Sequence, residues 1–189
     1  QTVESDKELL VELIYDSKAV TRRFLEKVIS NFNPNFLAEV SVERYKHMAY
    51  HEAACHIAQH VIVNVTKTDL RDRMLQVIGE NIFDFAIHPI ANYLVSKILK
   101  HLSPRDTVPV VCNAIKGKLI QLSCNKFASN VAQVLISVAD QRYLHDMVIE
   151  FFGTPGPVLY GIAEDRFGNF VVQSFINHAS LEDLRFIEN

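Results

Sequence analysis

The chain of 189 residues lacks several features that mark common protein classes. No apolar run approaches the roughly 20 residues of a membrane-spanning helix, and no secretory signal peptide stands at the start. Cysteine is scarce: Cys55, Cys112 and Cys124 lie far apart, and their odd number favours a reducing compartment. The formal net charge is −3, so the chain has no excess of basic residues that would indicate a phosphate-bearing partner. The first residues, QTV, include no initiator Met, which indicates a fragment.

Motifs of catalysis are also missing. The sequence contains no phosphate-binding glycine loop, no nucleophile elbow and no His-Glu-x-x-His motif. Its carboxylates are scattered, and Asp165, for example, has no second acid at a helical spacing. We therefore expect no enzymatic activity, no catalytic residue and no cofactor. With 49% hydrophobic and 22% charged residues, the chain is expected to be a folded, soluble protein without a membrane partner.

What the chain does contain is an internal repeat. Four segments align without gaps and read HEAACHIAQHVI, HPIANYLVSKIL, NKFASNVAQVLI and DRFGNFVVQSFI, starting at His51, His88, Asn125 and Asp165. Their spacings are 37, 37 and 40 residues. The longest interval contains GTPGP at residues 153–157, which predicts a loop there.

A fainter fifth copy, SKAVTRRFLEKVI, places Arg22 at the position of Cys55. Each copy follows a second apolar stretch with a helical period, such as LRDRMLQVIGENIFDFAI, and no segment alternates as a strand would. The sequence therefore predicts an all-α protein in which helix–turn–helix units stack into an α-solenoid, because such units cannot bury their apolar faces alone. The expected single domain, 1–189, holds repeats at 6–32, 36–66, 69–102, 106–139 and 142–179, with the start of a capping helix at 181–189.

The second helix of each unit carries a set of residues at spacing i, i+1, i+4, which share one side of a helix. The sets are Cys55/His56/Gln59, Asn92/Tyr93/Ser96, Ser129/Asn130/Gln133 and Asn169/Phe170/Gln173. Any one set is compatible with an ordinary solvated surface. Four in register favour the recognition of splayed RNA bases, because a flat group stacks on a base while its neighbours bond to the base edge. We expect these second helices to align along one concave face.

Other positions of the repeated helix are apolar and are expected to face the core. They are Phe127, Val131 and Ala132 in one copy and Phe167, Val171 and Val172 in the next. Phe127 and Phe167, which begin the repeated helix, are therefore predicted to be core residues.

The segments FGNFVVQ and KFASNVAQ closely resemble the repeat signature of the Pumilio (PUF) family of RNA-binding helical repeats. The resemblance is strong over residues 112–180, moderate over 40–101 and weak over 6–32. The order of the sets is similar to the last four of that family's eight repeats, and GTPGP falls where the family also has a longer connection. The resemblance implies a right-handed superhelix, either the C-terminal half of a Pumilio-type domain or a shortened relative, that reads one base per repeat.

Two sets match the family's code closely. The set at 169–173 resembles a uracil reader that stacks on Phe170. The set at 55–59 resembles an adenine reader that stacks on His56.

The other sets depart from the code. The set at 92–96 resembles a uracil reader, but Ser96 stands where the family has Gln and is too short for the same pair of hydrogen bonds. The set at 129–133 resembles a guanine reader, but Gln133 replaces Glu, and Ser with Gln is closer to an adenine pair. Arg22/Arg23/Glu26 matches no familiar set. Because RNA in this family runs antiparallel to the protein, the implied core is 5′-U-(A or G)-U-A.

Further polar residues have competing interpretations. His56 and His60, like His51 and Cys55, are spaced i, i+4, but no third ligand stands at a diagnostic spacing. Surface and capping histidines are therefore favoured over a metal site.

Lys126 and Arg166 lie one turn before the first residue of two sets. Contact with RNA phosphates and capping of a solvated turn are both compatible with that position.

Two functions remain compatible with the sequence. The first is sequence-selective binding of single-stranded RNA, with an mRNA 3′ untranslated region as target, protein co-regulators as further partners and a cytoplasmic location. The second is a divergent solenoid that binds a protein, or structured RNA without sequence preference, as relatives in ribosome assembly do, with a nucleolar location. The intact sets favour the first function. The net charge of −3 favours the second function, as do the two sets that depart from the family's code, at Ser96 and at Arg22.

Overall fold

The computed structural model describes residues 2–32 and 34–188; Gln1, Asn33 and Asn189, which belong to the expected domain, lie outside the described residues. The described part is helical and contains no strand, which confirms the predicted fold class. None of its helices is both long and apolar enough to cross a membrane. The elements are α1 (Thr2–Tyr15), α2 (Ala19–Asn31), α3 (Pro34–Ser41), η1 (Val42–Arg44), α4 (Tyr45–Tyr50), α5 (Glu52–Asn64), α6 (Thr68–Ile87), α7 (Asn92–His101), α8 (Pro104–Ile115), α9 (Leu119–Ser123), α10 (Ala128–Val138), α11 (Gln141–Phe152), α12 (Gly156–Glu164), α13 (Gly168–His178) and α14 (Leu181–Ile187).

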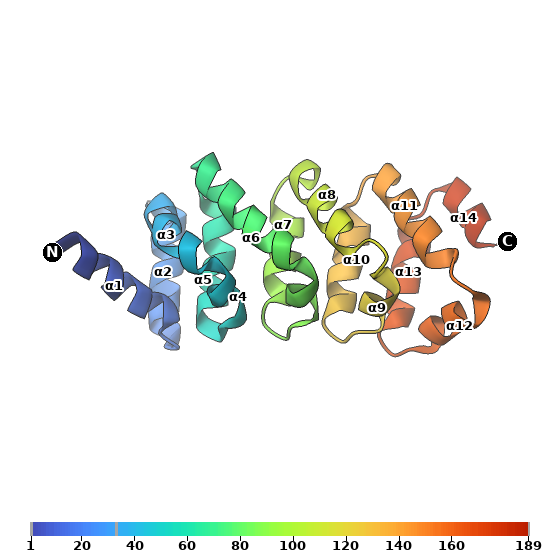
Figure 1. The fold of residues 1–189 in the computed structure, drawn as a ribbon, viewed down its shortest axis with the longest axis horizontal. Helices are drawn as coiled ribbons and strands as arrows, with labels where there is room; N and C mark the ends of the chain where they lie inside the picture. The colour runs from blue at the N-terminus through green and yellow to red at the C-terminus, as the bar shows by residue number, and fades with distance from the viewer. Residues whose placement is uncertain (1, 33, 189) are drawn as a thin grey trace.

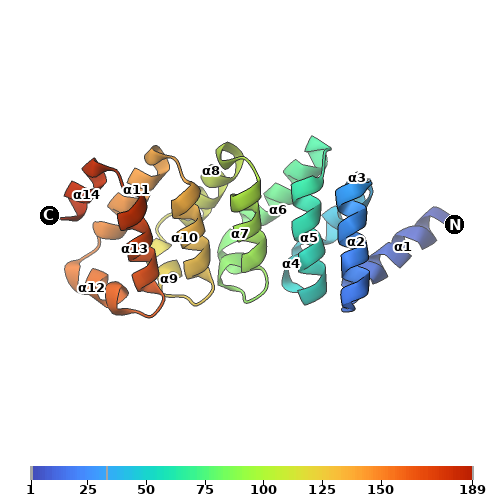
Figure 2. The ribbon, with the colours of Figure 1, turned by 180° about the vertical axis from the view of Figure 1, so that it is seen from behind.

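The helices form an elongated array that runs from one terminus to the other in chain order (Figure 1). Seen from behind, α2, α5, α7, α10 and α13 stand side by side in one layer, which we call the second-helix face (Figure 2). The remaining helices form the other layer, the first-helix face. Each second helix packs against the next. The predicted α-solenoid of stacked units is therefore confirmed. The repeat boundaries drawn from the sequence remain a prediction.

Stacking of the second helices depends on an apolar residue that faces the preceding helix. Ile57, Leu94, Val131 and Val171 occupy equivalent positions in α5, α7, α10 and α13, and each is at most 2% exposed. In α2 the equivalent residue is Phe24, which is 59% exposed because no second helix precedes α2 in the described residues. The apolar core is thus extended along the array rather than gathered at one centre.

The opposite side of each second helix carries a matching apolar residue toward the following helix. Ile62, Leu99 and Ile136 are at most 1% exposed, whereas the equivalent Ile176 of α13 is 48% exposed. The described array therefore has an uncovered stacking position at each end.

The first half of a repeat is more divided than the expected single helix. In three repeats short elements follow the first helix: η1 and α4 follow α3, α9 follows α8, and α12 follows α11. The predicted loop at 153–157 is also too long, because Gly156 and Pro157 already belong to α12. Proline fits this position because the first backbone N–H groups of a helix have no acceptor within it.

Four equivalent side chains accept backbone N–H bonds at the starts of the repeated helices. His51 and His88 accept backbone N–H bonds at Nδ1, and Asn125 and Asp165 accept them at Oδ1, over 2.8–3.3 Å. These bonds satisfy donors that a helix start would otherwise leave unpaired. His51 is therefore a cap, in agreement with the favoured interpretation from the sequence.

Phe127 and Phe167 are not core residues, so that prediction is wrong. Each is the N-cap residue of its helix and is only partly buried. Lys126 Nζ lies 5.4 Å from the centre of the Phe127 ring, and the guanidinium of Arg166 lies 4.6 Å from the centre of the Phe167 ring. A ring just before the first turn projects toward the solvated end of the helix, where the charged side chain covers it. The other predicted core residues are buried or pack partly buried against the core: Val131, Ala132, Val171 and Val172.

Candidate nucleic-acid interface

The four predicted sets lie on α5, α7, α10 and α13 of the second-helix face (Figure 2). Their first residues are buried within the array: Cys55 is 1%, Asn92 4% and Ser129 3% exposed. Asn169 is more exposed than these. The first three lie toward a following second helix, whereas none follows α13 within the described residues.

The second residue of each set is open to solvent. Tyr93 is 61% and Phe170 52% exposed, and His56 and Asn130 are also exposed. Two large rings at equivalent exposed positions of separate helices do not contribute to the core. They present flat surfaces on which a nucleic-acid base can stack.

In the three sets that contain glutamine, its amide nitrogen bonds to the first residue of the same set. The bonds run from Gln59 to Sγ of Cys55 (3.5 Å), from Gln133 to the carbonyl oxygen of Ser129 (3.1 Å) and from Gln173 to Oδ1 of Asn169 (3.3 Å). A glutamine amide has two N–H groups and a carbonyl oxygen, so each keeps capacity for another partner. The set on α7 has Ser96 at this place and therefore no such amide.

The asparagines of the sets use their N–H groups on the backbone. Asn92 Nδ2 donates to the carbonyl oxygens of His88 (2.8 Å) and Pro89 (3.0 Å), and Asn169 Nδ2 donates to that of Asp165 (2.8 Å). Because Asn92 Nδ2 is already bonded to two backbone carbonyl oxygens, Oδ1 is the atom that its amide offers to a ligand.

Cys55 is a buried thiol rather than a reactive group. Burial raises the pKa of Cys55 to about 11, so it stays protonated near neutral pH, and its Sγ lies 3.7 Å from the carbonyl oxygen of Ile90. His60, another residue considered as a metal ligand, has its Nε2 3.7 Å from a carboxylate oxygen of Glu26. Within the described residues no group of three or more His, Cys, Asp or Glu could hold a metal ion.

Two grooves run between neighbouring second helices and contain the sets of α5 and α7 and part of the set of α10. The α5–α7 groove is lined by Cys55, His56 and Gln59 together with Ile90 and Tyr93. The α7–α10 groove is lined by Asn92, Tyr93, Ser96 and Lys100 together with Asn130 and Gln133. Each groove thus combines a buried first residue with exposed flat groups from two successive helices. Tyr93 lines both grooves.

The fifth copy and the two basic residues complete the predicted site. On α2, Arg22 lies 3.8 Å from Glu26, so this copy presents an ion pair instead of a flat group between polar ones. Lys126 and Arg166 are exposed beside the sets and rest over their neighbouring rings. The turns that they precede are capped by Asn125 and Asp165 instead.

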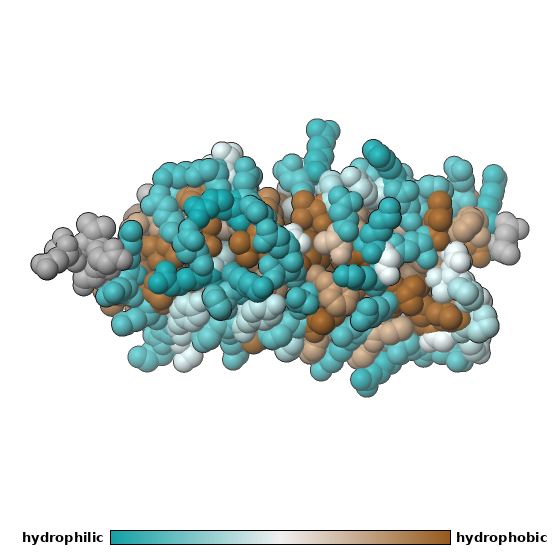
Figure 3. Space-filling model, in the orientation of Figure 1, coloured by the Kyte–Doolittle hydropathy of each residue, from teal (hydrophilic) through white to brown (hydrophobic). Residues whose placement is uncertain are grey.

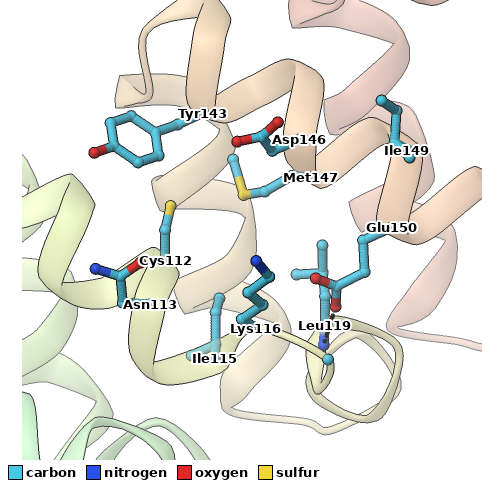
Figure 4. Close-up of a pocket in the computed structure, with 11 residues that line it drawn as sticks. Cys112, Asn113, Ile115, Lys116, Leu119, Tyr143, Asp146, Met147, Ile149 and Glu150 are labelled. Atoms are coloured by element: carbon cyan, nitrogen blue, oxygen red, sulfur yellow. Dashed lines mark hydrogen bonds between the residues drawn. The ribbon is translucent and has the colours of Figure 1, made fainter.

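A further groove lies on the first-helix face between α8, α9 and α11 (Figure 4). Hydrophilic residues cover much of this face, and apolar atoms gather on its C-terminal half (Figure 3). Glu150 Oε1 accepts a bond from the Leu119 N–H at 3.3 Å across the groove. Burial, with nearby carboxylates, raises the pKa of Cys112 to about 12, so this thiol is inert as well. The groove faces away from the predicted sets.

Comparison with known families identifies the repeat. A model described as "Pumilio-family RNA binding repeat" matches residues 81–113, 118–150 and 159–189, about half of the chain. The chain belongs to the Pumilio family. The match confirms the resemblance seen in the repeat signature, and it includes the sets on α7, α10 and α13.

Curated relatives of this Pumilio chain are distant and longer. Pumilio homolog 18 of Arabidopsis thaliana is 27% identical over 135 residues, which cover 68% of the chain and 40% of that protein. Suppressor protein MPT5 of Saccharomyces cerevisiae is 24% identical over 147 residues, which cover 76% of the chain and 17% of that protein. The chain therefore spans less than half the length of either relative.

Solved Pumilio structures share the fold. PUF-8 in complex with PBE-RNA superposes with a TM-score of 0.83 and 16% identity, over 97% of this chain and 55% of that one. A Puf4 mutant bound to the Cox17 RNA 3′ UTR recognition sequence also superposes with a TM-score of 0.83 and 16% identity, over 98% of this chain and 62% of that one. At this identity the likeness shows the fold alone.

Proposed function

We propose that this Pumilio chain binds single-stranded RNA sequence-selectively, one base per repeat, through the second-helix face. The observation that carries the proposal is the pair of grooves along α7. Each places hydrogen-bonding groups at its base and exposed flat groups at its sides. The proteins of two similar structures, PUF-8 and Puf4, are complexed with RNA, and this supports the same ligand here.

The spacing of the helices favours a single strand over a duplex. Packed helices lie about 8–10 Å apart, whereas stacked bases of a duplex follow one another about every 3.4 Å. A strand that offers one base to each second helix must therefore be unstacked. A protein side chain between successive bases can then replace the lost stacking.

The sets define the target. With the strand antiparallel to the protein, α13 reads the first base and α5 the fourth, which gives the core 5′-U-(A or G)-U-A. The setting that this target supports is post-transcriptional control of an mRNA through its 3′ untranslated region, in the cytoplasm, with protein co-regulators.

A salt titration with two RNAs tests the proposal. One RNA contains the core, the other has the same composition in scrambled order, and affinity is measured from low to high salt. Base reading predicts two parallel lines with the core RNA tighter at every salt concentration. A single shared line contradicts base reading. It would support the second candidate, binding of structured RNA without sequence preference, which the net charge of −3 and the Arg22–Glu26 pair favour.

A further inference from the structure

The set on α7 differs from the others in two linked ways. Ser96 replaces the glutamine, which removes the amide that bonds at the groove in the other sets. One turn later α7 carries Lys100, whereas the equivalent residues of α5, α10 and α13 are the uncharged Val63, Ser137 and Asn177. The helix without the glutamine is therefore also the helix with a cation beside that place.

Helix geometry directs the Lys100 side chain toward the position that the glutamine amide occupies in the other sets. Residues i and i+4 lie on one side of a helix, and side chains lean toward the helix N-terminus. The long Lys100 side chain therefore extends back over the turn that contains Ser96, and both residues line the α7–α10 groove. Lys100 is exposed, and within the described residues no acid lies within ion-pair distance of it.

The lining of the α7–α10 groove then includes two unlike groups, one from Asn92 and one from Lys100. Asn92 is 4% exposed and presents its Oδ1 acceptor, because its Nδ2 is already bonded to the carbonyl oxygens of His88 and Pro89. The ammonium of Lys100 is only a donor. A base that enters between Tyr93 and Asn130 meets an acceptor and a donor along its edge.

This pair matches one class of base. Uracil and guanine each place a ring N–H beside a carbonyl oxygen, whereas adenine and cytosine place a ring acceptor beside an amino group. A base with the carbonyl donates its ring N–H to Asn92 Oδ1 and accepts from Lys100. In the same orientation adenine or cytosine would place its ring acceptor against Asn92 Oδ1. Its amino N–H groups would then face the ammonium of Lys100.

We infer that the α7–α10 groove selects a keto base, uracil or guanine, and that Lys100 is the specificity residue that replaces the missing glutamine. The inference rests on the proposed RNA binding and adds the chemistry of the third base of the core. The contact is with the base edge because Lys100 lines the same groove as the buried Asn92, while the phosphates of an entering strand stay at the mouth.

The test compares four RNAs that carry U, G, C or A at the third position of the core. The parent should bind the U and G versions about tenfold more tightly than the other two. In Lys100→Met, which keeps an unbranched side chain of nearly the same length and removes the charge, the four affinities should fall within about threefold. Lys116→Met removes the same charge from the first-helix face and should behave as the parent does. Adding Ser96→Gln to Lys100→Met should restore the preference for U.

Other results overturn the inference. An equal loss for all four RNAs, with a salt slope shallower by about 0.7, means that Lys100 contacts a phosphate. A parent that discriminates at the first and fourth positions but not between keto and amino bases at the third refutes this inference alone. A parent that discriminates at no position refutes the proposed function together with it. Melting temperatures, expected to be unchanged because Lys100 is exposed, show whether each variant is folded.

Discussion

Replacing Tyr93 with alanine should weaken RNA binding more than any other single loss of a flat group. Its ring is 61% exposed and lines both grooves, so it can contact two successive bases. Stacking is worth about 1–3 kcal/mol per base in alanine substitutions. Two contacts give roughly 2–6 kcal/mol, at least about 30-fold in Kd. Phe170, on the last second helix described, should cost only about 1–3 kcal/mol.

Fluorescence anisotropy with a labelled core RNA measures these losses. Two further RNAs that are abasic at the third or the fourth position separate the two contacts, because a double-mutant cycle assigns a coupling to each base. Tyr93→Ala should couple to both positions. Tyr160→Ala is the matched control, since Tyr160 is an equally exposed tyrosine (66%) on α12, outside both grooves. Neither variant should change the melting temperature appreciably.

The reasoning is refuted if Tyr93→Ala couples to only one abasic position, or if it binds the core RNA as tightly as Tyr160→Ala does. The first result would show that the ring serves one groove. The second would show that the second-helix face is not where RNA binds.

Three further outcomes are expected. Gln173→Ala should lose about 1–3 kcal/mol of RNA affinity and relax the preference for U at the 5′ position, which binding to the four 5′ variants measures; an unchanged preference would contradict its role. Leu94→Ala should destabilise the fold by about 2–5 kcal/mol and Phe24→Ala, at the equivalent but exposed position, by less than about 1, as judged by urea unfolding; equal losses would contradict the stacking model. The hydrogen bond with Asp183 raises the pKa of His145, so this bond stabilises the fold fully below the ordinary histidine pKa of 6.5 and is lost as pH rises through the higher folded value. The melting temperature of the parent should therefore fall between pH 6 and pH 8 by more than that of His145→Gln, and parallel profiles would exclude the effect.

The repeat made most of the architecture predictable. A period near 37 residues reports a unit that stacks on copies of itself, so equivalent residues such as Asn92 and Ser129 had to occupy equivalent places in the array. Their depth was not predictable, because burial of these residues depends on the following helix. A sequence pattern within one helix contains no information about that neighbour.

Two failures have local causes. Phe127 and Phe167 were predicted to be core residues because they are apolar and adjoin a periodic segment. Helical periodicity, however, shows which face of the helix a residue occupies only for residues inside the helix. Phe127 and Phe167 stand at the N-cap position instead. The capping residues were recoverable from the sequence. His51, His88, Asn125 and Asp165 each stand four residues before the first member of a set, and such a recurrent polar position marks a helix start.

The uncovered stacking position at Phe24 has a consequence for motion. In a one-dimensional array each interior unit is held by two interfaces and a terminal unit by one, so local opening needs less free energy at the ends. Amide hydrogen exchange in the 189-residue chain should therefore be faster in α2 than in α7, which is packed between α5 and α10. Both grooves along α7 lie in the interior of the array, where exchange is expected to be slow. Under the proposed function, the bases that enter them would meet side chains held on an interior helix, so little conformational entropy would be lost there on binding.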